Sequence, residues 1–252
     1  MYGSGVAAAG KGHHPAAPAG STVAVFTRPA VSGRMSSPSV YLVRNEHDPE
    51  QSYHCDALAS CFPDAREIQF PAGERFDPEA ADAVVLSGST AGVYEREREW
   101  IPELDNIVRE LVDREVPTLG VCFGHQVANA ALGGTVEAVG LTSGLVEATF
   151  DDNPLFDGVP PVVVALHGDA VTERGEGMEA IAAAEHDPIF GTRHRSAPLW
   201  TVQFHPEITR EHRERLVADF DWEEGEHSFD DIAGERLFEN FRQLTGVEQA
   251  SV

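Results

Sequence analysis

A cysteine placed where an apolar strand meets a helix is the first feature of this sequence that suggests chemistry. Residues 118–134, TLGVCFGHQVANAALGG, run from an apolar stretch through Cys122 into a helical pattern that ends at two glycines. Small residues around such a turn let the backbone bend sharply and let a substrate approach. The positive end of the helix dipole also favours the thiolate form of a cysteine placed there. The pattern predicts that Cys122 is a nucleophile; the alternative is a buried cysteine that behaves as a small hydrophobic residue.

A second segment, QFHPE at residues 203–207, supplies the other groups that a cysteine nucleophile needs. An apolar strand delivers His205 at its end, and Pro206 restricts the backbone that follows. The carboxylate of Glu207, two positions on, is placed to orient the imidazole. We expect His205 to take the proton of Cys122 and return it to the leaving group. The alternative is a surface histidine at the start of a helix that Glu207 only supports.

Together these segments resemble the class I glutamine amidotransferases. GVCFGHQ is similar to the nucleophile motif of that family, and TVQFHPE, residues 201–207, is similar to its second signature. LHGDAVTE, residues 166–173, is similar to a His-Gly-Asp segment in the amidotransferase domain of GMP synthases, and the resemblance covers roughly residues 39–246. It implies that Cys122, His205 and Glu207 form a triad that hydrolyses the side-chain amide of glutamine through a cysteinyl thioester and releases ammonia. We expect this hydrolysis to need no metal and no organic cofactor, because a thiolate, a base and oxyanion donors suffice.

The same resemblance implies groups that hold the oxyanion and the substrate. One backbone N–H donor to the oxyanion is expected from Phe123. The other is expected from VLSGSTAGVYE, residues 85–95, where relatives commonly have Ser-Gly-Gly-Pro and this chain has Ser-Gly-Ser-Thr. We assign that donor to Ser89 or its neighbour Gly88. Gln126 and the backbone around His167, Gly168 and Asp169 are expected to bind the glutamine head and amide, and the alternative for any one of them is a purely structural role.

The destination of the ammonia is expected to lie on another polypeptide. No phosphate-binding glycine-rich loop follows the triad in this sequence, so we expect a separate ATP-dependent synthetase chain, as in GMP-synthase-like systems. Those domains often carry an Arg-Glu-Tyr-Gly-like segment after the paired glycines, where this chain reads VGLTSGLVE, so the surface that meets the partner is expected to differ. Two alternatives stay open, namely a stand-alone hydrolase of γ-glutamyl peptides and a non-catalytic regulatory module. The intact triad argues against the second.

The elements that must position these residues alternate between strand and helix. Apolar strand patterns occupy residues 39–43, 66–70, 82–87 and 116–121, and helical patterns occupy residues 49–60 and 100–114. This alternation predicts an α/β fold, a three-layer sandwich around a central, mostly parallel sheet, which the resemblance identifies as flavodoxin-like. Shorter strands follow, predicting an antiparallel or mixed extension of the sheet: residues 135–139, 145–150, 161–167, 178–185, 188–194 and 197–204. Helices are predicted at residues 207–220 and 232–244, on either side of an acidic loop.

Residues 1–38 and 39–247 are expected to differ in kind. The first segment is rich in Ala, Gly, Pro and Ser, which predicts a disordered low-complexity tail, and Met35 is a candidate translation start. The second is expected to be a single amidotransferase domain. The sequence contains no secretory signal pattern and no apolar stretch long enough to span a bilayer, which favours a cytoplasmic protein without a membrane partner.

Charge and cysteine content restrict the partners and the environment further. The formal charge is −24 and Lys11 is the only lysine, which argues against nucleic acid as a partner. Acidic residues occur along the whole length, so we hypothesise a working environment at high salt, where their mutual repulsion is screened. Cys55, Cys61 and Cys122 form an odd set without CxxC spacing, typical of a reducing compartment. Neither of two histidine groups, His47 with His54 and Cys55 or His186 with His194, has the spacing of a metal site.

Overall fold

The structure is a computed structural model that describes residues 39–220 and 222–247; the predicted tail and Met35 lie outside these residues. Within them, nine strands form one sheet in the order β2-β1-β3-β4-β9-β8-β7-β5-β6. The strands are β1 (Val40–Arg44), β2 (Arg66–Gln69), β3 (Ala83–Leu86), β4 (Thr118–Val121), β5 (Thr135–Phe150), β6 (Val162–Glu173), β7 (Met178–Ala184), β8 (Asp187–His194) and β9 (Leu199–Val202). The helices are α1 (Tyr53–Cys61), α2 (Trp100–Asp113), α3 (Phe123–Ala131), α4 (Arg213–Phe220) and α5 (Glu235–Thr245).

The core of the sheet is parallel. Strands β2, β1, β3, β4 and β9 pair in parallel, and β3, β4 and β9 are buried at every position. Strands with helices on both faces have no solvent side, which is why these segments read as continuous apolar runs rather than as an alternation. The predicted α/β sandwich is confirmed, with a sheet that is mixed overall and parallel in its core.

The other half of the sheet is antiparallel. Strands β8, β7, β5 and β6 continue from β9 through antiparallel pairs. The prediction of two short strands at residues 135–139 and 145–150 was wrong, because β5 runs through both as one strand of 16 residues. Gly140, with φ of +93°, lies where the pairing of β5 with β6 is irregular, and this glycine makes the sequence look interrupted.

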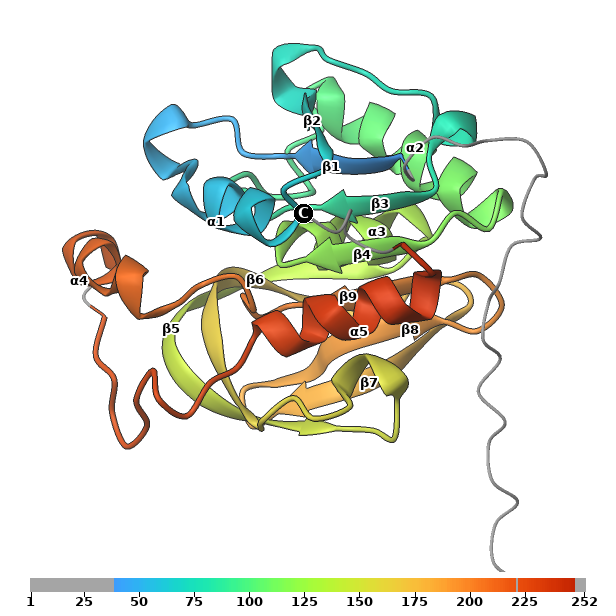
Figure 1. The fold of residues 1–252 in the computed structure, drawn as a ribbon. Helices are drawn as coiled ribbons and strands as arrows, with labels where there is room; N and C mark the ends of the chain where they lie inside the picture. The colour runs from blue at the N-terminus through green and yellow to red at the C-terminus, as the bar shows by residue number, and fades with distance from the viewer. Residues whose placement is uncertain (1–38, 221, 248–252) are drawn as a thin grey trace, which may run out of the picture.

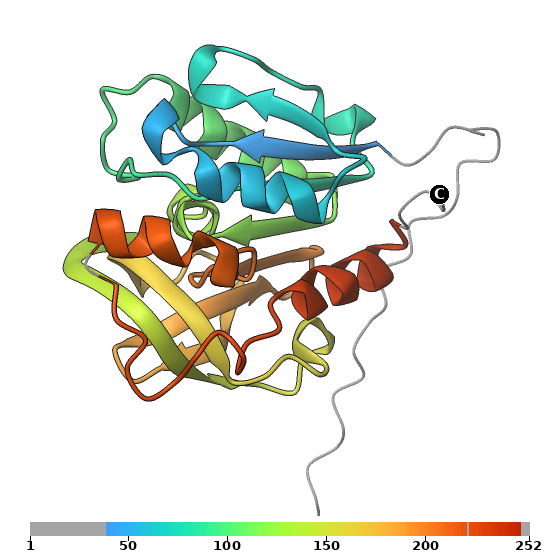
Figure 2. The same ribbon diagram turned by 60° about the vertical axis from the view of Figure 1, so that its left-hand side comes forward.

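Helices cover both faces of the parallel half, as Figures 1 and 2 show. Alternate residues of β1 point to opposite faces, so that Leu42 packs in one core and Val43 in the other. The first core receives Leu58 of α1 and Phe238 of α5, while the second is formed with α2 and α3. These two cores fix the ends of β1, β3, β4 and β9, at which the candidate residues lie.

The helix predicted for residues 207–220 begins later than expected. The chain after Pro206 first passes through a short 3₁₀ turn, Arg210–His212, and α4 starts only at Arg213. Thr209 caps this turn, because its backbone N–H and hydroxyl both lie within hydrogen-bond distance of the His212 ring. Glu207 is therefore free of any helix and faces inward.

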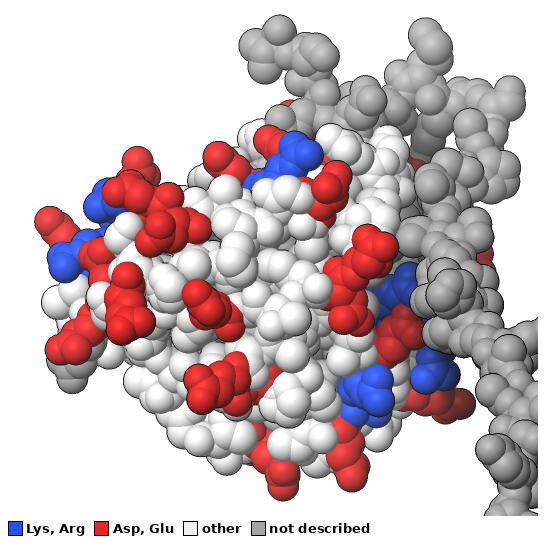
Figure 3. Space-filling view, turned by 90° about the horizontal axis from the view of Figure 1, so that it is seen from below, with Lys and Arg blue, Asp and Glu red and all other residues white. Residues whose placement is uncertain are grey.

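Acidic side chains are scattered over the face seen in Figure 3, where arginines are fewer. Several of the described arginines pair with nearby carboxylates, for example Arg44 with Asp56 and Glu67. In the described part of the chain, no helix is long and apolar enough to cross a membrane.

Candidate active site

Cys122 lies on a strained turn between β4 and α3. Its backbone has φ of 53° and ψ of −106°, a conformation that non-glycine residues rarely adopt. Two glycines make the turn feasible: a Cβ on Gly120 would lie 2.5 Å from the carbonyl oxygen of Gly124, and one on Gly124 would lie 2.4 Å from that of Leu86. The predicted sharp turn with a thiol at its apex is present.

His205 and Glu207 form a buried pair beside this turn. The imidazole Nδ1 lies 2.7 Å from a carboxylate oxygen of Glu207, and the two side chains are 4% and 0% exposed. The backbone N–H of His205 donates to Val164 of β6, which fixes the segment after β9 against the antiparallel half of the sheet. Burial lowers the pKa of His205, but the charges of Glu207 and Cys122 outweigh it and raise the pKa well above its usual value.

The carbonyl oxygen of Leu166 completes the surroundings of this histidine. It lies 3.2 Å from Nε2 of His205 and 3.9 Å from the sulfur of Cys122. A carboxylate and a carbonyl can only accept hydrogen bonds, so both ring nitrogens of His205 must donate. The geometry therefore fits the imidazolium form of His205, the form that pairs with a thiolate.

Gln203 is a neighbour of the cysteine that sequence reasoning missed. Its side-chain amide donates to the sulfur of Cys122 over 3.6 Å, and its carbonyl oxygen accepts from Gln126 at 3.2 Å. Gln203 is fully buried. Its place in the QFHPE segment, two residues before His205, was the available signal, because alternate strand residues point to the same side.

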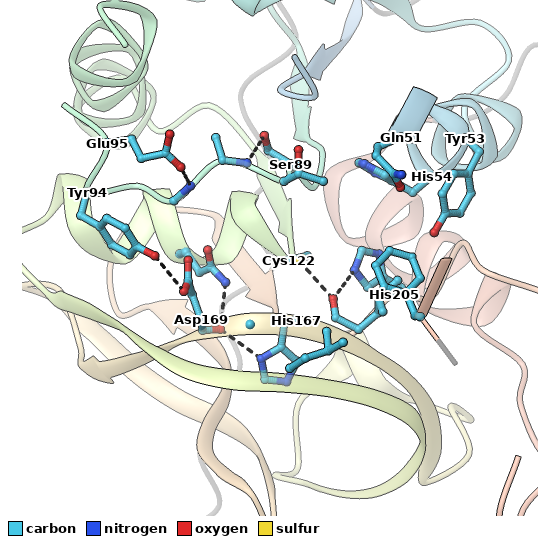
Figure 4. Close-up of a pocket in the computed structure, with 18 residues that line it drawn as sticks. Gln51, Tyr53, His54, Ser89, Tyr94, Glu95, Cys122, His167, Asp169 and His205 are labelled. Atoms are coloured by element: carbon cyan, nitrogen blue, oxygen red, sulfur yellow. Dashed lines mark hydrogen bonds between the residues drawn. The ribbon is translucent and has the colours of Figure 1, made fainter. Parts of the chain in front are cut away.

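Cys122, His205 and Leu166 line a pocket with a volume of about 290 Å³ (Figure 4). Of the predicted residues it contains Cys122, His205, Ser89, Gln126, His167, Gly168 and Asp169, and its other lining residues include Gln51, Tyr53, Tyr94, Glu95 and Leu141. The pocket is not lined by the other three predicted residues. Glu207 lies behind His205, and the Phe123 side chain is buried. Gly88 lies against the rings of His54 and His205. Figure 4 shows Ser89 and Tyr94 facing Asp169 and His167 across the pocket.

The two predicted oxyanion donors come from different elements. Phe123 is the first residue of α3, so its N–H has no partner within the helix and lies directly after the nucleophile. Ser89 lies in the loop after β3, and its hydroxyl accepts from the N–H of Ala91 at 3.1 Å, which tightens this loop.

The His-Gly-Asp segment forms one wall of the pocket on β6. Gln126 donates to the carbonyl oxygen of Asp169 at 3.0 Å, and Nδ1 of His167 lies 3.0 Å from the same oxygen. The hydroxyl of Tyr94 donates to the Asp169 carboxylate at 3.1 Å. Burial lowers the pKa of His167 to about 4, so this ring is neutral at physiological pH. Its Nε2 lies 3.2 Å from that of His186.

The two histidine groups considered as metal sites are only partly brought together. His54 lies within hydrogen-bond distance of Glu46 and Cys55, and His186 meets His167 rather than His194. Among the residues that the structure describes, no group of three or more His, Cys, Asp or Glu side chains is arranged to hold a metal ion.

The sequence of this chain is similar to those of known amidotransferases. A family model described as glutamine amidotransferase class-I matches residues 52–223. A GMP synthase from Nocardia farcinica is 37% identical over 142 residues, which are 55% of this chain and 26% of that protein. One from Thermosipho melanesiensis is 31% identical over 163 residues, 64% of this chain and 29% of that protein. The chain thus spans between a quarter and a third of the length of these relatives.

Solved structures share the fold. A glutamine amidotransferase from Thermotoga maritima superposes with a TM-score of 0.63 at 22% identity, covering 84% of this chain and 95% of that one. A Thermoplasma acidophilum protein described as a candidate GMP synthase subunit gives 0.60 at 18% identity, covering 84% and 96%. With more than half of its residues matched by the family model, the chain belongs to the class I glutamine amidotransferases, a family of glutamine-hydrolysing enzymes.

Proposed function

We propose that this chain hydrolyses the side-chain amide of glutamine with Cys122 as nucleophile, His205 as acid and base, and Glu207 as the group that orients and charges His205. The observation that supports this most is the placement of His205 between two acceptors, the carboxylate of Glu207 and the carbonyl of Leu166, next to the sulfur of Cys122.

The proposed reaction proceeds in two halves. The thiolate of Cys122 attacks the amide carbon, a C–S bond forms, and the carbonyl oxygen takes the electron pair. Backbone N–H groups of Phe123 and of Ser89 or Gly88 stabilise this oxyanion. When the intermediate collapses, the C–N bond breaks and the imidazolium of His205 gives its Nε2 proton to the departing nitrogen. Neutral His205 then takes a proton from the water that attacks the thioester, which releases glutamate and restores the thiolate.

The pocket also supports a position for the rest of the substrate. The Asp169 carboxylate, which Tyr94 holds through its hydroxyl, suits the α-ammonium group of glutamine. Gln126 and His167 both bond the Asp169 backbone, so they hold this wall of the pocket in place. Gly168 leaves space beside it, since a Cβ there would meet nothing within 4 Å.

We propose that the ammonia serves an ATP-dependent synthetase on another chain, in a GMP-synthase-like reaction. The matched relatives are GMP synthases that are described as glutamine-hydrolysing. A structural neighbour described as a candidate GMP synthase subunit supports an amidotransferase on its own polypeptide.

The test is ammonia release from glutamine and from γ-glutamyl dipeptides by the wild type, Cys122→Ala and Cys61→Ser, at low and multimolar salt. Cys61 is a matched control because it is a half-buried thiol of α1 that does not line the pocket. We expect glutamine turnover that disappears in Cys122→Ala and persists in Cys61→Ser. Turnover restricted to γ-glutamyl dipeptides would replace this proposal with a peptide hydrolase. No turnover on either substrate, with or without an added synthetase, would contradict it.

A further inference from the structure

A buried carboxylate that the triad does not use lies behind the loop after β3. Glu46 follows β1, and its side chain is 1% exposed. One oxygen accepts from the backbone N–H groups of His47 and Asp48, each at 2.8 Å. Burial alone would raise the pKa of Glu46, but its hydrogen bonds, with His54 first among them, lower it to about 2. This carboxylate is therefore charged at neutral pH.

The same carboxylate holds Thr90 through two bonds. The backbone N–H of Thr90 donates to one oxygen of Glu46 at 2.7 Å, and its hydroxyl donates to the other at 2.8 Å. A proline at this position would offer neither donor. The bidentate contact fixes the peptide that follows Ser89, the residue with a predicted oxyanion donor.

His54 links this carboxylate to the loop and to the catalytic histidine. Its Nε2 lies 3.3 Å from Glu46. Its ring packs against Gly88, where an added Cβ would lie 3.2 Å from Cε1 of His54 and 3.4 Å from Cε1 of His205. The two imidazole rings meet edge to face, with centroids 6.1 Å apart. Only a glycine therefore fits at position 88 without a shift of one of these rings.

The start of the loop is anchored from the same segment of chain. The side chain of Asn45 donates to the carbonyl oxygen of Ser87 at 2.9 Å, and its backbone N–H donates to the Ser87 hydroxyl, also at 2.9 Å. The thiol of Cys55 donates to that hydroxyl at 3.3 Å. Residues 45–55 thus hold the loop at Ser87 and at Thr90, on both sides of the donor peptide.

We propose that Glu46 and His54 are positioning residues for amide hydrolysis. They hold the loop of Gly88, Ser89 and Thr90 so that one of its backbone N–H groups faces the oxyanion. The N–H of Phe123 faces the oxyanion from the opposite side. The inference rests on the proposed function. It gives these buried residues a task at the site, although neither is expected to touch the reacting atoms.

The test compares Glu46→Gln with Asp105→Asn, a matched change of a buried carboxylate in α2 that is paired with Arg96 and lies outside the pocket. A lost oxyanion donor acts in the transition state, so Glu46→Gln is expected to lower kcat about 10- to 100-fold with KM changed less than about threefold. Asp105→Asn is expected to keep the kcat of the wild type. Thr90→Val should lower kcat as well, while Thr90→Ser, which keeps the hydroxyl, should retain it.

Two further measurements separate this inference from the triad assignment. Alkylation of Cys122 by iodoacetamide should proceed at the wild-type rate in Glu46→Gln, because the nucleophile is unchanged. Amide hydrogen exchange of residues 86–93 should accelerate in Glu46→Gln but not in Asp105→Asn, and this readout needs no turnover. A kcat for Glu46→Gln equal to that of Asp105→Asn, a loss confined to KM, or unchanged exchange in this loop would overturn the inference. Loss of turnover in Cys122→Ala tests the proposed function separately.

Discussion

Replacing Glu207 by glutamine removes a charge and nearly preserves shape, so it isolates what the carboxylate contributes. The wild-type carboxylate lies 2.7 Å from Nδ1 of His205, with both side chains buried. With about 4 Å between charge centres and an effective dielectric constant of about 20, the attraction amounts to about 4 kcal/mol. An amide oxygen would still accept the Nδ1 hydrogen bond, worth about 1 kcal/mol. We expect the thiolate–imidazolium state to become about 2 to 4 kcal/mol harder to populate, which lowers kcat/KM about 30- to 1000-fold.

The pH profile shows in which direction the charge of Glu207 shifts the pKa of His205. The pKa of His205 is higher in the folded protein than in the unfolded chain. The protonated ring therefore stabilises the folded protein fully at a pH below the pKa of the unfolded state. This stabilisation is lost as the pH rises through the pKa of the folded state. Without the charge of Glu207 the folded pKa falls, so the basic limb of kcat/KM should move to lower pH. The assay is ammonia release from pH 5 to 10, with melting curves to confirm that the variant is folded. A wild-type rate, or a basic limb that stays in place, would refute the assignment of Glu207 as the charge partner.

The other predictions concern packing, the cysteine and salt. Gly124→Ala should lower the melting temperature by about 4 to 10 °C, because its Cβ meets the Leu86 carbonyl and overpacking costs about 1 to 3 kcal/mol. Gly144→Ala, whose Cβ would have no neighbour among the described residues closer than 3.9 Å, should leave the melting temperature unchanged. Equal melting temperatures for the two variants would contradict this prediction. Gln203→Leu should lower kcat/KM about 5- to 10-fold through the lost hydrogen bond to sulfur, and an unchanged value would remove Gln203 from the site. Multimolar KCl should raise the melting temperature above that in dilute buffer, because screening reduces the repulsion within a chain of charge −24. A lower melting temperature in KCl would argue against the high-salt hypothesis.

The parts of the fold that the sequence predicted are those with local, repeated signals. Apolar runs at β3 and β4 and the strongly amphipathic pattern of α2 report burial directly, and the structure contains all three elements. The helix predicted at residues 207–220 began too early. The Arg- and Glu-rich composition of this segment favours a helix, but Glu207 faces inward and contacts His205. Composition carries no information about such a tertiary contact.

The candidate site likewise has a part that the sequence predicted and a part that only the fold reveals. Cys122, His205 and Glu207 lie in two short motifs, so their meeting could be anticipated, and the structure brings them together. Glu46 and His54 lie eight residues apart with no recognisable spacing, and the contact of Glu46 with Thr90 spans 44 positions of sequence. Only the fold, which places the segment after β1 beside the loop after β3, reveals that contact.

The two buried histidine–glutamate pairs, His205 with Glu207 and His54 with Glu46, have opposite consequences for the catalytic base. Although burial lowers the pKa of His54, its bonds to Cys55 and Glu46 raise it overall to about 10, against the opposing charge of His205. Loss of Glu46 therefore favours neutral His54, which relieves a repulsion on the His205 cation rather than adding one. Glu46→Gln should not move the basic limb of the pH profile to lower pH, whereas Glu207→Gln should. If both substitutions shifted that limb downward, Glu46 would act on the base and not through the loop that it holds.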